Sequence, residues 1–299
     1  MTLDCLMSSV QSIAKLVKIL ETEDYMVLKA LSSAISHHKF LNIHQLAGYS
    51  KMHRDVVGYR IDRLSDFKLI SKSTNGAYLL MSGLDVLALK TFVDKGIIEG
   101  LGMPIGIGKE SDVVEAITEN AQIRAIKFFR IGRISFRQVR KKRSFTIEEQ
   151  LHHWLLTNVR AAEREYTILR KLQSQGVAIP TPYYRKLHAI AMSRIEGTRL
   201  AETKDIVNPR QTFYDILRGI RVAYQHDIIN CDLSEYNILI DIDSRPWIID
   251  WPQSVSRRHP NADLLIRRDI SNVVNFFNKR FHLRINTAEA LEEVQTGIS

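Results

Sequence analysis

The chain has 299 residues, 45% of them hydrophobic and 25% charged, which is ordinary for a soluble globular protein of two domains. Its net charge of +9 favours an anionic partner, although a surplus of this size also serves solubility. The two cysteines, Cys5 and Cys231, are far apart and argue against a disulfide framework. No apolar run reaches transmembrane length, and the N-terminus has no basic segment leading into an apolar one. We therefore expect a cytoplasmic protein without a membrane partner.

The first part of the chain, residues 1–90, is predicted to form a winged helix-turn-helix domain. Helical periodicity appears in "SVQSIAKLVKIL" and "DYMVLKALSSAI", and two shorter helices follow in "NIHQLAGYS" and "KMHRDVVGYRIDRLSDF". In "KLISKSTNGAYLLM", two apolar runs flank Asn75-Gly76, which is a strong hairpin signal. The second helix of such a pair can enter a nucleic-acid groove.

Basic residues on that helix are the candidates for nucleic-acid contact. They are His53, Arg54, Arg60 and Arg63. Winged helices also dock proteins, and basic residues can simply solvate one face, so both interpretations stay open.

A glycine loop opens the second part of the chain, residues 91–299. Four glycines fall within residues 100–108, and Gly106 and Gly108 are followed by Lys109, Glu110 and Ser111. Glycine lets the backbone approach a phosphate closely, with its N–H groups directed at the anion. Taken alone this signal is weak, because glycines also mark ordinary turns.

A buried lysine and a buried glutamate are predicted next. Strand alternation in "QIRAIKFFRI" puts Lys127 among apolar neighbours, and helical periodicity puts Glu165, but not Glu163, on an apolar stripe. A buried charge needs an opposite partner. We expect Lys127 and Glu165 to pair, as in a kinase that holds nucleotide phosphates.

An acid, an amide and a second acid are predicted to converge at one strand edge. "NILIDIDSRPWIIDW" predicts a strand, a turn and a returning strand, which brings Asp250 beside Asn237, with Asp232 on the preceding loop. Few protein oxygens together with nucleotide phosphates suit Mg²⁺. Asn237 and Asp250 would bind the metal, and Asp232 would orient or deprotonate the attacking group.

These motifs together resemble the protein-kinase superfamily, and within it the atypical RIO kinases of archaea and eukaryotes, in the subtype with an N-terminal winged helix. The resemblance covers nearly the whole chain. It rests on "GIGKESDV", "AIKFFRIGRISFR", "AAEREYTILRKL", "CDLSEYNILI", "IIDWPQ" and "HPNADLLIRRDISNVVNFF", in this order and spacing. The resemblance implies an α+β fold, with the winged helix followed by a truncated two-lobed kinase domain. Its N-lobe would span about 91–192 and its C-lobe about 196–299.

The resemblance further implies the site and the partners. Asp232, Lys127 and Glu165 would be catalytic, and ATP would bind with Mg²⁺ or Mn²⁺. Nucleotide contacts would come from Gly106, Gly108, Lys109, Glu110, Ser111 and Lys127, and from Met192, Ser193, Ile195 and Glu196 in the connector between the lobes. The partner would be the small ribosomal subunit precursor, with its rRNA and ribosomal proteins; the oligomeric state is left open.

Two positions depart from the family pattern, and two further features accompany the resemblance. Ser111 replaces the third glycine of the usual kinase loop, and Asn230 stands where histidine is usual, in a position that supports the loop. Cys231 is expected to be a packing residue rather than a reactive thiol. Six of the eleven residues at 133–143 are basic, and Arg140, Lys141, Lys142 and Arg143 are candidates for RNA contact.

The leading interpretation is a serine/threonine protein kinase or ATPase of small-subunit maturation. One alternative is a small-molecule phosphotransferase of the aminoglycoside-kinase type. A second is a nucleic-acid-binding regulator with an inactive kinase fold. The complete set of Lys127, Glu165, Asp232, Asn237 and Asp250 argues against an inactive fold.

Overall fold

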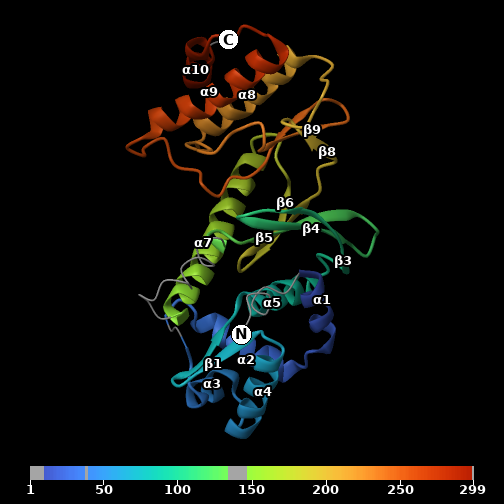
Figure 1. Cartoon of the computed structure of the whole chain (residues 1–299), viewed down its shortest axis with the longest axis vertical. Coiled ribbons are helices and arrows are strands. Elements are labelled where there is room, and N and C mark those ends of the chain that lie inside the picture. The colour runs from blue at the N-terminus through green and yellow to red at the C-terminus, as the bar shows by residue number, and fades with distance from the viewer. Residues whose placement is uncertain (1–9, 38–39, 134–146, 298–299) are drawn as a thin grey trace. The chain divides into compact units, whose positions relative to one another are not determined.

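A computed structural model describes residues 10–37, 40–133 and 147–297, which form helices and three β-sheets (Figure 1). The helices are α1 (Val10–Ile19), α2 (Thr22–Ala34), α3 (Ile43–Ser50), α4 (Arg54–Asp66), α5 (Met81–Asp94), α7 (Ile147–Gln173), α8 (Pro209–Gln225), α9 (Ala262–Phe281) and α10 (Thr287–Thr296). The strands are β1 (Ile70–Ser73), β2 (Gly76–Leu79), β3 (Gly100–Ile107), β4 (Ser111–Ile117), β5 (Ile123–Phe129), β6 (Pro182–Lys186), β7 (Ala189–Ser193), β8 (Gly197–Arg199), β9 (Ile238–Asp241) and β10 (Pro246–Ile248).

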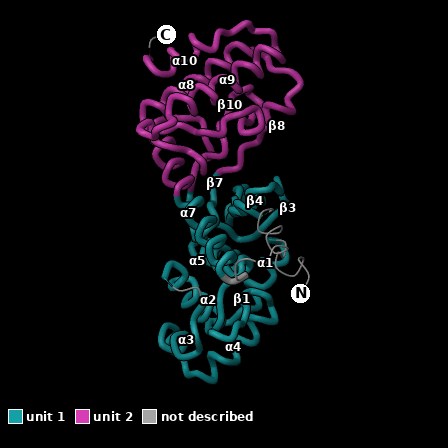
Figure 2. Tube along the Cα trace, turned by 60° about the vertical axis from the view of Figure 1, so that its left-hand side comes forward, with its two compact units in different colours: residues 1–163, 183–192 teal, residues 164–182, 193–299 magenta. Residues whose placement is uncertain are grey.

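The chain divides into two compact units (Figure 2). The first comprises residues 1–163 and 183–192, and the second comprises residues 164–182 and 193–299. The division differs from the boundary near residue 90 that we expected, because the N-terminal helices and the five-stranded sheet belong to one unit. The domain boundary near residue 90 stays a prediction.

The helix-turn-helix and hairpin lie where the sequence predicts them. Asn42 caps α3 by accepting the N–H of Gln45, and Lys51 ends this helix in the left-handed conformation. β1 pairs with β2 in antiparallel register, with Ser73 opposite Gly76. Gly76 has φ +142°, and a Cβ there would come within 2.3 Å of the Leu41 carbonyl oxygen. The residue must therefore be glycine for the hairpin to pair beside Leu41.

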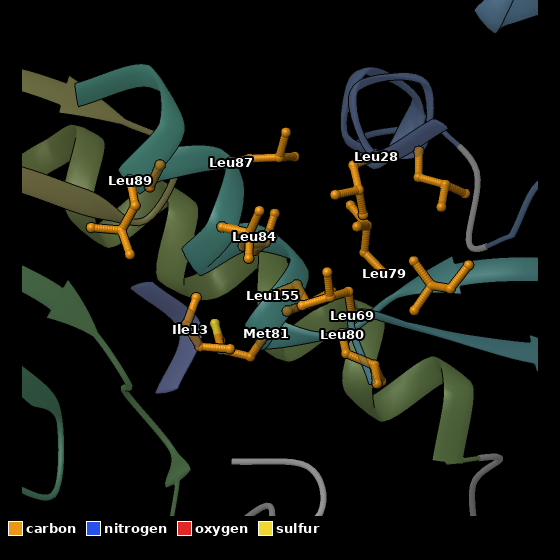
Figure 3. Close-up of a cluster of buried hydrophobic side chains, with 14 of the residues drawn as sticks. Ile13, Leu28, Leu69, Leu79, Leu80, Met81, Leu84, Leu87, Leu89 and Leu155 are labelled. Atoms are coloured by element: carbon orange, nitrogen blue, oxygen red, sulfur yellow. The ribbon is translucent and has the colours of Figure 1, made fainter. Parts of the chain in front are cut away.

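Helix α5, which the sequence analysis did not foresee, lies in the core of the first unit (Figure 3). Its side chains are buried from Met81 through Leu89. Leu84 and Leu87 pack in the same hydrophobic cluster as Ile13 of α1 and Leu155 of α7. A helix that is apolar on all sides is a buried core helix. The N-terminal helices and the sheet therefore share one hydrophobic core.

Two of the residues predicted to contact nucleic acid have acidic partners inside the protein. Arg60 is 9% exposed, and its guanidinium lies 2.8 Å from Glu21 and 3.4 Å from the fully buried Asp24. Arg63 lies 2.5 Å from the Glu21 carboxylate. Both side chains therefore point toward acids at the start of α2, and their contact with nucleic acid stays a prediction. His53 and Arg54 are exposed at the start of α4, and their contact with nucleic acid stays a prediction.

Replacing Arg60 with alanine is expected to destabilise the first unit. The change would leave the buried Asp24 carboxylate with fewer donors, which costs about 1–3 kcal/mol. Urea denaturation of wild type and variant measures the loss. Arg54→Ala, at an exposed position on the same helix, is the control and should change the unfolding free energy by less than about 0.5 kcal/mol. Equal stability of Arg60→Ala and wild type would contradict the expectation.

The sheet of the first unit has the strand order β3-β4-β5-β7-β6. β3 and β4 form an antiparallel hairpin, and its connecting turn contains the predicted glycine loop, with the Gly108 N–H donating to the Ser111 carbonyl at 2.8 Å. β4 pairs with β5, so that Val113 lies opposite Lys127. The strand pairing therefore places the glycine turn and the predicted lysine on neighbouring strands.

An ionic network lies inside the first unit, between α5 and this sheet. Arg130 donates from Nη2 to Asp85 Oδ1 at 2.8 Å and from Nε to Asp112 Oδ2 at 3.0 Å. His188 Nε2 lies 2.8 Å from the same oxygen of Asp85. Burial would raise the pKa of Asp85, but the Arg130 charge and the His188 hydrogen bond outweigh it and hold this pKa below its ordinary value. Burial lowers the pKa of His188, which is therefore neutral at pH 7.

The buried imidazole predicts that acid destabilises the protein. Because the pKa of His188 is depressed on folding, the unfolded chain binds the proton more readily, and stability is lost as pH falls through about 6.5. Urea denaturation at pH 7.5 and 5.5 should show a smaller loss for His188→Gln than for wild type. The difference is at most about 1.4 kcal/mol per pH unit. Identical pH dependence of the two proteins would contradict the prediction.

The second unit contains a small antiparallel sheet and the last three helices. Its strand order is β10-β9-β8, and its core includes Phe213, Trp251 and Phe277. Phe213 and Phe277 pack edge to face, with ring centroids 5.5 Å apart. Within the described residues, no helix combines the length and the apolar character needed to cross a membrane.

Candidate active site

The predicted acid and amide lie together on the loop before β9. Asn237 donates from its side-chain nitrogen to the Asp232 carbonyl at 2.8 Å and to the Asp232 carboxylate at 3.2 Å. Ser234 closes the loop by accepting the Asn237 backbone N–H at 3.0 Å. Because the Asn237 nitrogen makes both contacts with Asp232, its side-chain oxygen is the atom that can face a ligand.

Asp250 follows the returning strand, with a register one residue different from the prediction. Asn237 lies opposite Ile249, whose N–H donates to the Asn237 carbonyl at 2.9 Å, and Asp250 is the next residue. Asp250 has φ +70°, a left-handed conformation that is uncommon for aspartate. Such a conformation costs about 1–3 kcal/mol and is found most often at functional sites.

Asn230 joins the loop to the segment that carries Asp250. Its side-chain nitrogen donates to the Asp250 carbonyl at 3.0 Å, and its oxygen accepts the Asp232 N–H at 3.1 Å. The two acids of the site are thus held by one buried amide. Asparagine supports the loop here, as we expected for this position.

Helix α9 holds the same loop through side chains that the sequence analysis quoted but gave no role. Asp269 accepts the N–H of Cys231 at 2.7 Å and the N–H of Leu233 at 3.4 Å. Arg268 donates to the Cys231 carbonyl, and Asn272 donates to the Leu233 carbonyl at 3.0 Å. The sequence contains a pattern that could have indicated this role. Asp269 lies on the apolar stripe of "LLIRRDISNVVNFF", between Ile266 and Val273. A buried carboxylate on such a stripe needs donors.

Burial and neighbouring charges shift the pKa values of three groups on and beside this loop. Partial burial and the carboxylate of Asp250 raise the pKa of Asp232 above its ordinary value, although the Asn237 hydrogen bond opposes the change. Burial also raises the pKa of Asp269 to about 6 and the pKa of Cys231 to about 11. Cys231 is therefore a neutral, buried thiol at pH 7, which fits the packing role we expected.

In the first unit, Lys127 is buried as predicted. It is 7% exposed on β5, and its ammonium lies 4.9 Å from the centre of the Phe129 ring. The glycine turn between β3 and β4 is held by hydrogen bonds from two arginines. The Glu110 carbonyl accepts the Arg130 N–H at 2.6 Å, and the Gly108 carbonyl accepts from the Arg133 side chain at 3.3 Å. These bonds fix two carbonyls of the turn, and the Gly108 N–H is itself bonded to the Ser111 carbonyl. Binding of an anion by this turn stays a prediction.

Glu165 is 2% exposed on α7, while Glu163 is exposed, as the helical periodicity predicted. The Lys127–Glu165 pair itself stays a prediction.

Met192, the first of the connector residues predicted to contact the nucleotide, is buried at the end of β7. Ser193 donates its N–H to the Thr181 carbonyl at 2.9 Å, and its contact with the nucleotide stays a prediction. Ile195 is half-buried and Glu196 exposed, and their contact with the nucleotide stays a prediction.

The residues of the second unit suit a magnesium ion bound with a nucleotide rather than a closed protein cage. Within the described residues, no group of three or more histidine, cysteine, aspartate or glutamate side chains is placed to hold a metal. Asn237 and Asp250 would supply two oxygen ligands, which fits the open coordination that Mg²⁺ takes when phosphates complete its shell. A cation there would also relieve the repulsion between Asp232 and Asp250.

The basic residues predicted to contact RNA, Arg140, Lys141, Lys142 and Arg143, lie outside the described residues.

Comparison with known families defines the class of protein. Residues 112–290 match the RIO domain, and residues 17–95 match the Rio2 N-terminal domain. The chain therefore belongs to the RIO family of serine/threonine kinases, in the subtype with the Rio2 N-terminal domain. The predicted family and the predicted fold class, a winged helix before a truncated kinase-like domain, are confirmed.

Relatives from archaea and eukaryotes extend this result. The RIO-type serine/threonine-protein kinase Rio2 of Methanocaldococcus jannaschii is 34% identical over 81% of this chain and 92% of its own length. The Rio2 kinase of Saccharomyces cerevisiae is 31% identical over 88% of this chain, which spans 65% of that protein. The Rio2 kinase of Chaetomium thermophilum, solved as an ADP/Mg²⁺-phosphoaspartate complex, is similar with a TM-score of 0.81 and 27% identity over 95% of this chain and 93% of that chain. The predicted cofactors, ATP and Mg²⁺, agree with the ligands of that relative.

Proposed function

We propose that the chain is an ATP- and Mg²⁺-dependent serine/threonine protein kinase, or an ATPase built on the same chemistry, that acts in maturation of the small ribosomal subunit. One observation carries the enzymatic part of the proposal. Asp232 and Asn237 are in hydrogen-bond contact on a loop held by three side chains of α9, and Asn230 links this loop to Asp250. Such support is what a catalytic loop requires.

Each residue then has a role that follows from its chemistry. Asp232 orients the attacking hydroxyl or water and accepts its proton, which its raised pKa favours. Asn237 and Asp250 would hold Mg²⁺, which when bound neutralises charge on the nucleotide phosphates. In the first unit, the turn around Gly108 and the ammonium of Lys127 would bind phosphate oxygens, with Glu165 as the partner we propose for Lys127.

The site of action is proposed from the exposed and basic parts of the chain. His53 and Arg54 are exposed at the start of α4, and Tyr59 of the same helix is 60% exposed. Basic and aromatic side chains together suit RNA, through phosphate contacts and base stacking. With a net charge of +9, this composition supports binding to the rRNA and proteins of a small-subunit precursor in the cytoplasm.

Turnover of γ-labelled ATP tests the proposal. Purified protein is incubated with labelled ATP and Mg²⁺, with and without small ribosomal subunits, and both protein-bound label and released phosphate are followed. Acid-stable label on serine would establish a protein kinase. Phosphate release stimulated by the subunits, with little stable label, would establish an ATPase. Neither signal despite nucleotide binding would contradict the proposal and favour a regulator with an inactive fold.

The same assay separates a third outcome. Asp250 is itself a candidate to accept the phosphoryl group, because the solved relative contains a phosphoaspartate. An acyl phosphate on Asp250 would be released by hydroxylamine, whereas phosphoserine would not. Label transferred to an aminoglycoside in place of protein would support the small-molecule phosphotransferase alternative.

A further inference from the structure

The ionic network of the first unit connects helix α5 to the turn that carries the predicted phosphate-binding glycines. The connection begins at Asp85, in the middle of α5, where the side chain is 3% exposed. An unneeded buried carboxylate is costly, and a hydrophobic residue would pack better in an otherwise apolar helix. Packing alone therefore does not account for an aspartate at position 85.

The hydrogen bonds lead from Asp85 to the turn in a few steps. Arg130 bridges Asp85 and Asp112, at 2.8 Å and 3.0 Å. Arg133 binds the same oxygen of Asp112 at 2.5 Å and reaches the Gly108 carbonyl at 3.3 Å. A second route is shorter, because the backbone N–H of Arg130 donates to the Glu110 carbonyl at 2.6 Å.

The segment that carries both arginines is also held by α7. Asn158 accepts the Ile131 N–H at 2.7 Å, and Trp154 donates to the Ile131 carbonyl at 2.6 Å. Asn158 is fully buried. With its backbone held between α7 and the sheet, this segment can transmit a displacement of Arg130 to the turn.

We propose that Asp85 is a positioning residue for nucleotide binding: through Arg130 and Asp112 it fixes the turn at residues 108–111 in the shape that binds nucleotide phosphates. The inference rests on the proposed function, since it assumes that this turn binds phosphate. Asp85 itself touches no nucleotide. Its carboxylate fixes Arg130, whose backbone N–H holds the Glu110 carbonyl. Arg133, bound to the same Asp112 oxygen as Arg130, holds the Gly108 carbonyl. Residues in such networks typically change the affinity of a distant ligand by about 2- to 30-fold.

Asp85→Asn tests the inference, with Asp24→Asn as the matched control. Both residues are buried aspartates of the first unit that pair with arginine, but the arginine partners of Asp24 are Arg60 and Arg63 of α4, away from the glycine turn. Binding of ADP with Mg²⁺ is measured by titration calorimetry, on variants whose circular dichroism shows them folded. We expect Kd for ADP to rise about 2- to 30-fold in Asp85→Asn and to stay at the wild-type value in Asp24→Asn.

Each other outcome is decisive. Wild-type affinity in folded Asp85→Asn would overturn the inference, and so would equal weakening in both variants, because that would indicate general destabilisation. If wild type bound no ADP, the proposed function itself would fail. Should Asp85→Asn not fold, Arg130→Lys replaces it: the lysine keeps a positive charge beside Asp85 but cannot bridge to Asp112. Unchanged affinity in Arg130→Lys would overturn the inference.

Discussion

Replacing Asp232 with asparagine is expected to abolish turnover of ATP while the protein stays folded and binds nucleotide. Asparagine keeps the shape of the side chain but cannot accept a proton, and loss of a general base costs about 10²- to 10⁴-fold in rate. Asp232 is only partly buried, and the loop is held mainly through its backbone, by Asp269, Arg268 and Asn272, so the fold should tolerate the change. Phosphate release from γ-labelled ATP at saturating concentration measures the effect.

Asp243→Asn is the control for this prediction. Asp243 is an exposed aspartate in the turn between β9 and β10, a few residues along the chain from Asn237, and its carboxylate lies 3.9 Å from the side chain of Arg245. Its substitution should leave turnover within about twofold of wild type, as expected for an exposed site away from the chemistry. An Asp232→Asn variant with wild-type turnover would contradict the assignment of Asp232.

Replacing Asp269 with alanine is expected to destabilise the second unit and to reduce activity. The change leaves the N–H groups of Cys231 and Leu233 without their acceptor inside the protein, at a cost of about 2–5 kcal/mol. The loop would then no longer hold Asp232 in place. A displacement of its carboxylate by about 1 Å can cost about 100-fold in rate. Urea denaturation and ATP turnover, measured on the same preparation, give the two effects.

Asp263 provides the comparison, because it is an exposed aspartate in the first turn of the same helix. Asp263→Ala should change stability by less than about 1 kcal/mol, which is what loss of a favourable charge at a helix N-terminus costs. If Asp269→Ala were as stable and active as Asp263→Ala, the support of the catalytic loop by α9 would be disproved.

The sequence predicted best where a short pattern determines the structure. The hairpin around Asn75-Gly76 and the burial of Glu165 beside exposed Glu163 followed from turn chemistry and helical period. The juxtaposition of Asp232 and Asn237 followed from the spacing of two residues on one loop. The register of Asp250 was wrong by one residue, because the turn between β9 and β10 is fixed by Asp241, which accepts the N–H groups of Asp243 and Arg245.

Elements and side chains that depend on distant partners were not predictable. Helix α5 is buried on all sides and therefore lacks the amphipathic period that marks a helix in a sequence. The ion pairs of Arg60 and Arg63 join them to Glu21, which lies about forty residues earlier in the chain, so no short-range pattern indicates them. Asp269 acts on a loop 36 to 38 residues away. In each case the deciding contact is tertiary.

The most direct test of the central claim is the effect of Mg²⁺ on ADP binding in wild type and Asp250→Asn. If Asn237 and Asp250 hold a metal that binds with the nucleotide, Mg²⁺ should tighten ADP binding to wild type and have little effect on the variant. The variant should bind ADP alone about as well as wild type does. An equal gain from Mg²⁺ in both proteins would contradict the account, because the metal would then be held without Asp250.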